Sequence, residues 1–121
     1  MPDDTMLAHT VYFALRDNSE QARKSFIAAC KRHLSGHPGM LLFAVSVLAA
    51  DIDSPVNDRR FDVAVHLVFS NKAAHDQYQE SPRHLQFLEE NEGCWREVRA
   101  FDSYVDSVAA AMDSVAATGA C

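Results

Sequence analysis

The sequence predicts a single α+β domain in which strands and helices follow the order β-α-β-β-α-β. Four short segments are rich in β-branched and aromatic residues, as strands are, and two longer segments carry apolar residues at helical spacing. The chain has 121 residues, 48% of them hydrophobic, so it is long enough for one substantial core and too short for two. We therefore assign residues 1–106 to one domain and residues 107–121 to an Ala-rich tail.

The first half of the chain predicts a strand followed by a helix. Residues 9–15, "HTVYFAL", form the strand, and Asn18 or Ser19 is a suitable N-cap for the following helix. Gly36 and Pro38 end that helix. Its apolar residues recur on one face, at Ala22, Phe26, Ala29, Cys30 and Leu34.

The middle of the chain predicts a long β-hairpin. Residues 41–50 and 61–70 are strand-like, and the polar segment 51–60 joins them. Both strands carry apolar residues at both parities, so both faces of the sheet need a cover. Helices cover only one face in this topology, and a second copy of the sheet is the simplest cover for the other. The pattern therefore predicts a homodimer whose two sheets face each other.

After the hairpin, the sequence predicts a helix that stops and starts again. The first part ends at about Gln79, and Ser81 and Pro82 then have the residue types of an N-cap and a first helical position. The new helix ends near Gly93, and residues 97–105 form a fourth strand. The complete order is the ferredoxin-like arrangement.

Composition excludes several classes of partner and cofactor. The formal charge of −6 argues against nucleic acid, which is bound by clustered Lys and Arg. No apolar run approaches the roughly 20 residues that a membrane span needs, and the acidic start lacks the apolar segment of a secretory signal, so we expect a cytoplasmic protein. Three cysteines without a CxxC motif indicate neither disulfides nor a thiolate metal site. Phosphate-loop and HExxH motifs are absent too, so we expect no cofactor and no metal.

Four segments carry a resemblance to a known family, namely "HTVYFALRD", "HLVFSN", "YQESPRHLQF" and "VRAFDSY". Over about residues 8–105, the chain resembles the stress-responsive A/B barrel (Dabb) domain family. A common pattern in that family is Tyr-x-x-His-Pro-x-His. Tyr78, Pro82 and His84 match this pattern, whereas Ser81 stands in place of its first histidine. The resemblance implies a dimeric α/β barrel of ferredoxin-like protomers.

The resemblance also implies candidate catalytic residues. One characterised kind of family member is a polyketide cyclase, which closes a ring by intramolecular aldol chemistry. Its strand-one histidine corresponds to His9, and its helix-two tyrosine and histidine correspond to Tyr78 and His84. In such an enzyme His84 abstracts a proton next to a carbonyl, Tyr78 hydrogen-bonds the developing enolate, and His9 orients or relays.

The residues themselves allow two interpretations of His84. It lies in the first turn of the restarted helix, where the helix dipole disfavours a charged imidazole. It also shares a helix face with Phe87 and Leu88, so we expect its pKa to lie below the ordinary value of about 6.5. Under the other interpretation, a backbone carbonyl or a water satisfies His84, and Tyr78 is a core residue.

The other histidines give weaker signals. His9 faces the pocket if its side of the first strand lines the barrel lumen, and is otherwise a strand-start histidine hydrogen-bonded to a neighbour. We interpret His33 and His37 as solvated residues at a helix end, and His66 as a packed strand residue. His75 lies in the second helix, where related barrels use a histidine for haem, but no second ligand accompanies it.

These observations predict a homodimer that binds a small, largely apolar organic molecule in the barrel pocket, with His9, Tyr78 and His84 available for acid-base chemistry. The alternatives are a non-catalytic stress-related barrel and a haem or cofactor-free monooxygenase of related fold. An apolar cavity that holds the three residues together favours the enzyme, and a filled interior favours the non-catalytic barrel.

Overall fold

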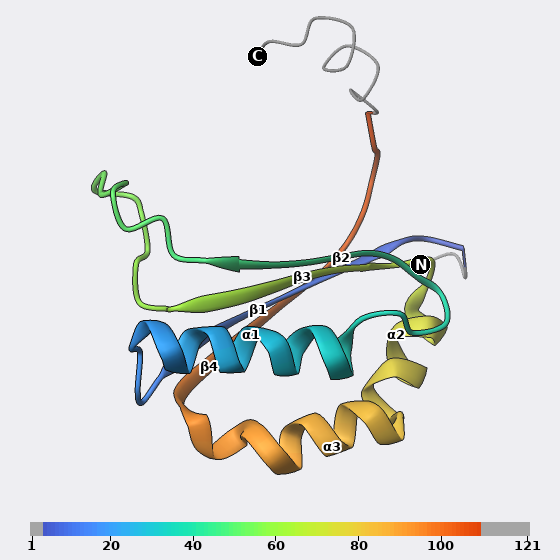
Figure 1. The fold of residues 1–121 in the computed structure, drawn as a ribbon. Coiled ribbons are helices and arrows are strands. Elements are labelled where there is room, and N and C mark those ends of the chain that lie inside the picture. The colour runs from blue at the N-terminus through green and yellow to red at the C-terminus, as the bar shows by residue number, and fades with distance from the viewer. Residues whose placement is uncertain (1–3, 110–121) are drawn as a thin grey trace, which may run out of the picture.

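The structure is a computed structural model that describes residues 4–109. Within these residues, four strands form one antiparallel sheet, and all the helices pack against the same face of that sheet (Figure 1). The strand order β2-β3-β1-β4 confirms the predicted ferredoxin-like fold. Residues 110–121, most of the predicted tail, lie outside the described residues. The strands are β1 Leu7–Leu15, β2 Met40–Val47, β3 Val63–Phe69 and β4 Trp95–Tyr104.

Side-chain caps fix where the helices begin, and the sequence predicts the caps of α1 and α3. The Ser19 hydroxyl accepts a backbone N–H at the start of α1, Asn71 does so for α2, and Ser81 does so for α3. None of the helices among residues 4–109 has both the length and the apolar content needed to cross a membrane. The helices are α1 Glu20–Leu34, α2 Lys72–Glu80, α3 Pro82–Asn91 and a short 3-10 turn, η1, at Glu92–Cys94.

The core lies between the sheet and the helices. Alternate residues of the two central strands, β1 and β3, point toward α1 and α3, as the period of two in a strand requires. Burial of these side chains is the main stabilising contribution, worth about 1.5–3 kcal/mol for each large apolar side chain. The most deeply buried members include Phe13, Phe26, Cys30, Leu34, Val65, Leu67, Phe69 and Phe87.

No helix covers the opposite face of the sheet within the described residues. Figure 1 shows every labelled helix on the other side. Leu42 of β2 pairs with Val68 on this open face and is 48% exposed, and Phe101 of β4 is 54% exposed. The sheet is therefore apolar on both faces, as the strand pattern predicted, and its open face presents a surface of the kind that a second sheet covers.

A close backbone approach holds α2 against the start of β2. Gly39 has φ of +77°, and a Cβ built on it would lie 2.4 Å from the Cβ of Ala74 in α2. Its carbonyl accepts the N–H of Ser70 at 2.8 Å. Only glycine both adopts the left-handed backbone conformation without strain and leaves room for Ala74. This position therefore holds α2 above the end of β3.

Candidate active site

A cavity of about 210 Å³ lies on the helix side of the sheet, beneath α3. His9, Tyr78 and His84, which the sequence named from three different elements, all line it. The rest of the wall is mainly apolar and includes Phe13, Leu34, Phe87 and Trp95. The cavity therefore lies inside one protomer, whereas the lumen of a barrel would lie on the open face of the sheet.

Ser81 joins the two helices that carry Tyr78 and His84. Its hydroxyl accepts the backbone N–H of His84 at 3.2 Å and donates to the carbonyl of Tyr78 at 2.9 Å. Because α2 ends and α3 begins at this residue, the chain changes direction and the two rings converge. Their centroids lie 4.7 Å apart. Ser81, the one departure from the family pattern, is therefore the residue that brings the pair together.

His84 is a buried base without a partner for one of its ring nitrogens. The residue is only 9% exposed, and no described residue makes a hydrogen bond to its Nδ1. Burial lowers the pKa of His84 below 6.5, although a hydrogen bond to the Gln79 carbonyl opposes the shift. The expected direction of the pKa shift is confirmed, and the ring is neutral at pH 7. A neutral imidazole next to a cavity is able to accept a proton.

Tyr78 complements the base, because its hydroxyl is a hydrogen-bond donor that stays protonated. It is 3% exposed and packs between the rings of Phe69 and His37 as well as His84. Burial raises the pKa of the Tyr78 hydroxyl above its ordinary value of 10. The hydroxyl therefore keeps its proton and is able to donate it in a hydrogen bond to a ligand oxygen.

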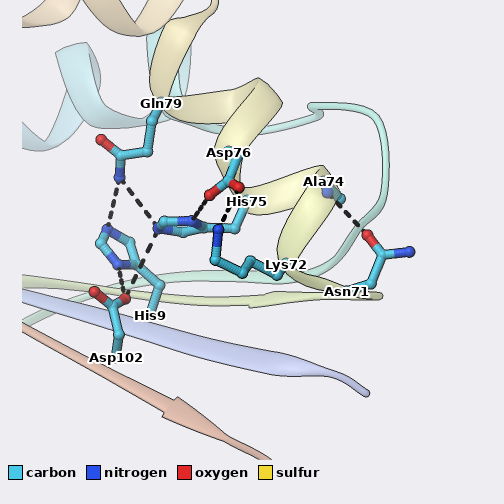
Figure 2. Close-up of polar contacts among 8 residues, drawn as sticks. All are labelled: His9, Asn71, Lys72, Ala74, His75, Asp76, Gln79 and Asp102. Atoms are coloured by element: carbon cyan, nitrogen blue, oxygen red, sulfur yellow. Dashed lines mark hydrogen bonds and ion pairs between the residues drawn. The ribbon is translucent and has the colours of Figure 1, made fainter. Parts of the chain in front are cut away.

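His9 enters the site from the sheet. Its Nδ1 is bonded to the carboxylate of Asp102 on the neighbouring strand β4, directly opposite in the strand register (Figure 2). Because a carboxylate only accepts, Nδ1 carries the proton and Nε2 carries the lone pair. The His9 and Tyr78 ring centroids are 6.3 Å apart. His9 is thus hydrogen-bonded to a neighbour, as the second interpretation expected, and it also lines a cavity, although this cavity lies on the helix side of the sheet and not in a barrel lumen.

Sequence reasoning missed three residues at this end of the cavity: Gln79, Asp102 and, as part of this cluster, His75. The Gln79 amide nitrogen lies 3.5 Å from Nε2 of both His9 and His75 (Figure 2). A signal for Asp102 was present, since it is a charged residue that shares strand parity with Val98 and Ala100. A charged side chain whose same-face neighbours on the strand are apolar is costly to bury alone, so a polar partner is expected.

Two further expectations need correction. His33 and His37 are buried, each 6% exposed, and not solvated as predicted. The His37 Nε2–H donates to the carbonyl of His33 at 2.8 Å, and the His37 ring packs edge-on against Tyr78. His33 Nε2 lies 3.5 Å from Glu90 of α3, an ion-pair distance without hydrogen-bond geometry. The reason for their burial is that α3 packs against the end of α1, which the helix pattern alone does not indicate.

A larger hollow of about 460 Å³ lies on the open face of the sheet. Its walls come from the β2–β3 loop and from Tyr12, Phe61 and Phe101. Its charged groups, Asp58 and Arg99, already pair with each other at 2.8 Å. We place the candidate site in the smaller cavity because three acid-base side chains, His9, Tyr78 and His84, line its largely apolar wall.

Comparison with known proteins agrees with the observed fold. The profile of the stress-responsive A/B barrel (Dabb) domain matches residues 7–105. A Dabb family protein with a ferredoxin-like fold from Mesorhizobium loti superposes with a TM-score of 0.72 at 24% identity, covering 85% of this chain and 99% of the other. No curated protein matches the chain.

Two other solved structures show how the fold is used elsewhere. A hydroxynitrile lyase from Passiflora edulis has a TM-score of 0.69 at 19% identity and covers 90% of this chain and 100% of its own. A dimeric ferredoxin-like protein from Thermobifida fusca has a TM-score of 0.69 at 16% identity, with coverages of 87% and 95%. At these identities the likeness establishes the fold.

Proposed function

The chain belongs to the stress-responsive A/B barrel (Dabb) family, and we propose that it binds a small, largely apolar carbonyl compound in the cavity beneath α3 and moves a proton on it. The observation that carries this proposal is that His84 and the protonated Tyr78 both line an apolar cavity, and that the buried Nδ1 of His84 has no hydrogen-bond partner among the described residues. A base and a hydrogen-bond donor on one side of such a cavity are the groups that enolisation requires.

In the proposed reaction, His84 takes a proton from the carbon next to the ligand's carbonyl. The electron pair of the broken C–H bond becomes the enolate, and Tyr78 stabilises the oxygen by a hydrogen bond. The enolate either takes the proton back or attacks a second carbonyl of the same molecule. In the second case the carbonyl π bond breaks as the new C–C bond forms, and the resulting alkoxide takes the proton from His84. His84 returns to its neutral form in both cases. His9, held by Asp102, orients the ligand or relays the proton.

The apolar wall supports this assignment in physical terms. Phe13, Phe87 and Trp95 exclude water from one side of the cavity, and a low dielectric strengthens the hydrogen bond from Tyr78 to a developing negative charge. The same wall keeps His84 neutral. The lyase activity of the Passiflora edulis protein supports the view that this fold accommodates chemistry on small organic molecules.

We propose as well that two copies pair through the open sheet face. Leu42 and Phe101 are half-exposed there, and the similar protein from Thermobifida fusca is dimeric. Such pairing leaves the cavity beneath α3 accessible, because the helices lie on the outer side (Figure 1). Each protomer then carries a complete site of its own.

A pair of probes tests ligand binding. Acetophenone has an apolar ring and a carbonyl oxygen, and toluene has the ring alone. We expect saturable binding of acetophenone by calorimetry or ligand-observed NMR, with toluene bound at least about tenfold more weakly because it cannot accept the Tyr78 hydrogen bond. His84→Ala should weaken acetophenone binding, and His66→Ala, on the open face, should not. Equal affinity for both probes in all three proteins would refute the proposed site.

A further inference from the structure

A cluster of donor atoms outside the His84–Tyr78 pair has an unusual arrangement. One ligand atom from each of His9, His75 and Asp102 lies within 4.8 Å of the other two. His75 comes from α2, His9 from β1 and Asp102 from β4, so the fold brings together three elements at this point (Figure 2). The sequence had indicated no metal site, because the three residues follow no known spacing motif.

A hydrogen bond orients the ring of His75. Its Nδ1–H donates to the carboxylate of Asp76 at 3.0 Å, so Nε2 is the ring nitrogen that is available to a metal ion. The Lys72 ammonium lies 2.6 Å from the other oxygen of the Asp76 carboxylate, so the orienting group is itself held in place. Carboxylates hold metal-binding histidines in this way in many metalloproteins.

The Nε2 of His75 faces the carboxylate of Asp102 at 3.9 Å, which is too far for a direct hydrogen bond. A cation placed between these two atoms is attracted by the carboxylate and has a nitrogen ligand in Nε2. Within the described residues, the donor that reaches this point is the Gln79 amide, at the long distance of 3.5 Å from His75 Nε2.

From this geometry we propose that His9, His75 and Asp102 bind a divalent transition-metal ion of the zinc class. Two imidazoles and one carboxylate, with a fourth position open, form the ligand set of catalytic zinc and of related iron(II) sites. Nitrogen ligands of this kind disfavour Mg²⁺ and Ca²⁺, which prefer oxygen. This metal site is separate from the His84–Tyr78 pair. It shares one residue, His9, with the proposed acid-base site.

The distances suit a metal after a small movement. Two ligands on one tetrahedral zinc ion lie about 3.4 Å apart. His75 Nε2 and Asp102 are 3.9 Å apart, and the ligand atoms of the two histidines lie within 4.8 Å of each other. The Asp102 carboxylate, now bonded to His9, has to move away from it to admit the ion. The Asp102 side chain is 48% exposed, so it is free to move and its solvent side provides a path of entry.

The remaining hydrogen bonds support the same ligand set. When His9 Nδ1 binds the metal, its proton moves to Nε2, which lies 3.5 Å from the Gln79 amide group. After a rotation of that amide, Gln79 Oε1 accepts the Nε2–H. Each ligating histidine then donates its other N–H to a side-chain acceptor, His9 to Gln79 and His75 to Asp76. No proton is gained or lost in this rearrangement.

Titration of the tag-free, chelator-treated protein tests the proposal. We expect calorimetry to show one Zn²⁺ per chain with micromolar or tighter affinity, and Co²⁺ to give the visible absorption of a low-coordinate site. His75→Ala and Asp102→Asn should each weaken binding at least about tenfold, and Asp76→Asn should weaken it less. His66→Ala, which removes an unrelated histidine, is the matched control and should bind as the wild type does.

The outcomes separate this proposal from the proposed function. His84→Ala should keep Zn²⁺ binding and lose acetophenone, whereas His75→Ala in metal-free form should lose Zn²⁺ and keep acetophenone. If His75→Ala does not fold, Asp102→Asn, which preserves the shape of the side chain, decides the result. Absence of stoichiometric Zn²⁺ binding, or Zn²⁺ binding that survives both substitutions unchanged, overturns the metal site.

Discussion

The rings of Tyr78 and His84 lie 4.7 Å apart between centroids, although one ends a helix and the other begins the next. A continuous helix places residues six apart on different faces, about 240° around the axis. The break at Ser81 and Pro82 removes that constraint, and the caps of Ser81 hold the new geometry. The interruption of the helix thus creates the pair of groups on which the proposed chemistry depends.

Ser81→Ala should separate this pair. The substitution removes an N-cap, so we expect the free energy of unfolding to fall by about 1 kcal/mol, together with weaker acetophenone binding. Ser19→Ala is the matched control, because it removes the N-cap of α1 at a similar cost but lies far from the cavity. Urea unfolding and calorimetry measure the two effects. Equal loss of binding in both variants would contradict a local role for Ser81.

Stability should depend on pH through His84. Its pKa in the folded chain lies below the value of 6.5 in the unfolded chain, so the unfolded state binds more protons as the pH falls. The stability contributed by neutral His84 is therefore present above pH 6.5 and declines below it, by at most about 1.4 kcal/mol per pH unit. His84→Asn should flatten the pH dependence of urea unfolding between about pH 7 and 5. Identical slopes for the two proteins would mean that His84 is not held neutral.

Tyr78→Phe should change function more than stability. Burial holds the Tyr78 hydroxyl in its protonated form next to the cavity, and phenylalanine fills nearly the same volume, so we expect a change in stability below about 1.5 kcal/mol. Loss of the donor should slow proton transfer on a carbonyl probe by about 10²–10³-fold. Tyr12→Phe on the open face serves as control. A Tyr78→Phe protein that unfolds at much lower temperature and turns over normally would make Tyr78 a core residue.

Gly39→Ala should be far more destabilising than Gly36→Ala. Both glycines have positive φ, so both substitutions carry the same type of backbone strain. Only at Gly39 does the new methyl group meet Ala74, at 2.4 Å, whereas nothing lies within 4 Å of Gly36. We expect the difference between the two variants to be about 1–3 kcal/mol in urea unfolding. Similar values for both would show that α2 moves freely away from β2.

The open sheet face should hold two copies together. Sedimentation at micromolar concentration should give about twice 13.4 kDa for the wild type. Phe101→Asp places a charge in the apolar patch and should give monomers. Leu85→Asp on α3, on the opposite side of the sheet, where the side chain is 52% exposed, is the control and should remain dimeric. A monomeric wild type would remove the case for the two-sheet barrel.

Local chemistry explains which parts of this structure were predictable from sequence. The caps at Ser19 and Ser81 and the strand parities depend on residues close together in the chain, so the element order and the Tyr78–His84 break follow from the sequence. The bond from His9 to Asp102 spans 93 positions and depends on the β1–β4 register, which no local pattern determines. The burial of His37 likewise arises from contact between distant elements. The sequence therefore named the cavity pair and missed the cluster beside it.

Deuterium exchange into acetophenone tests the central claim most directly. Acetophenone is incubated in D₂O with the chelator-treated protein, and incorporation into its methyl group is followed by NMR. If His84 and Tyr78 enolise a bound carbonyl compound, exchange should exceed that with free imidazole at equal concentration by at least about 10²-fold. His84→Ala should return the rate to that background, and His66→Ala should match the wild type. A wild-type rate equal to that of His84→Ala would contradict the proposed acid-base site.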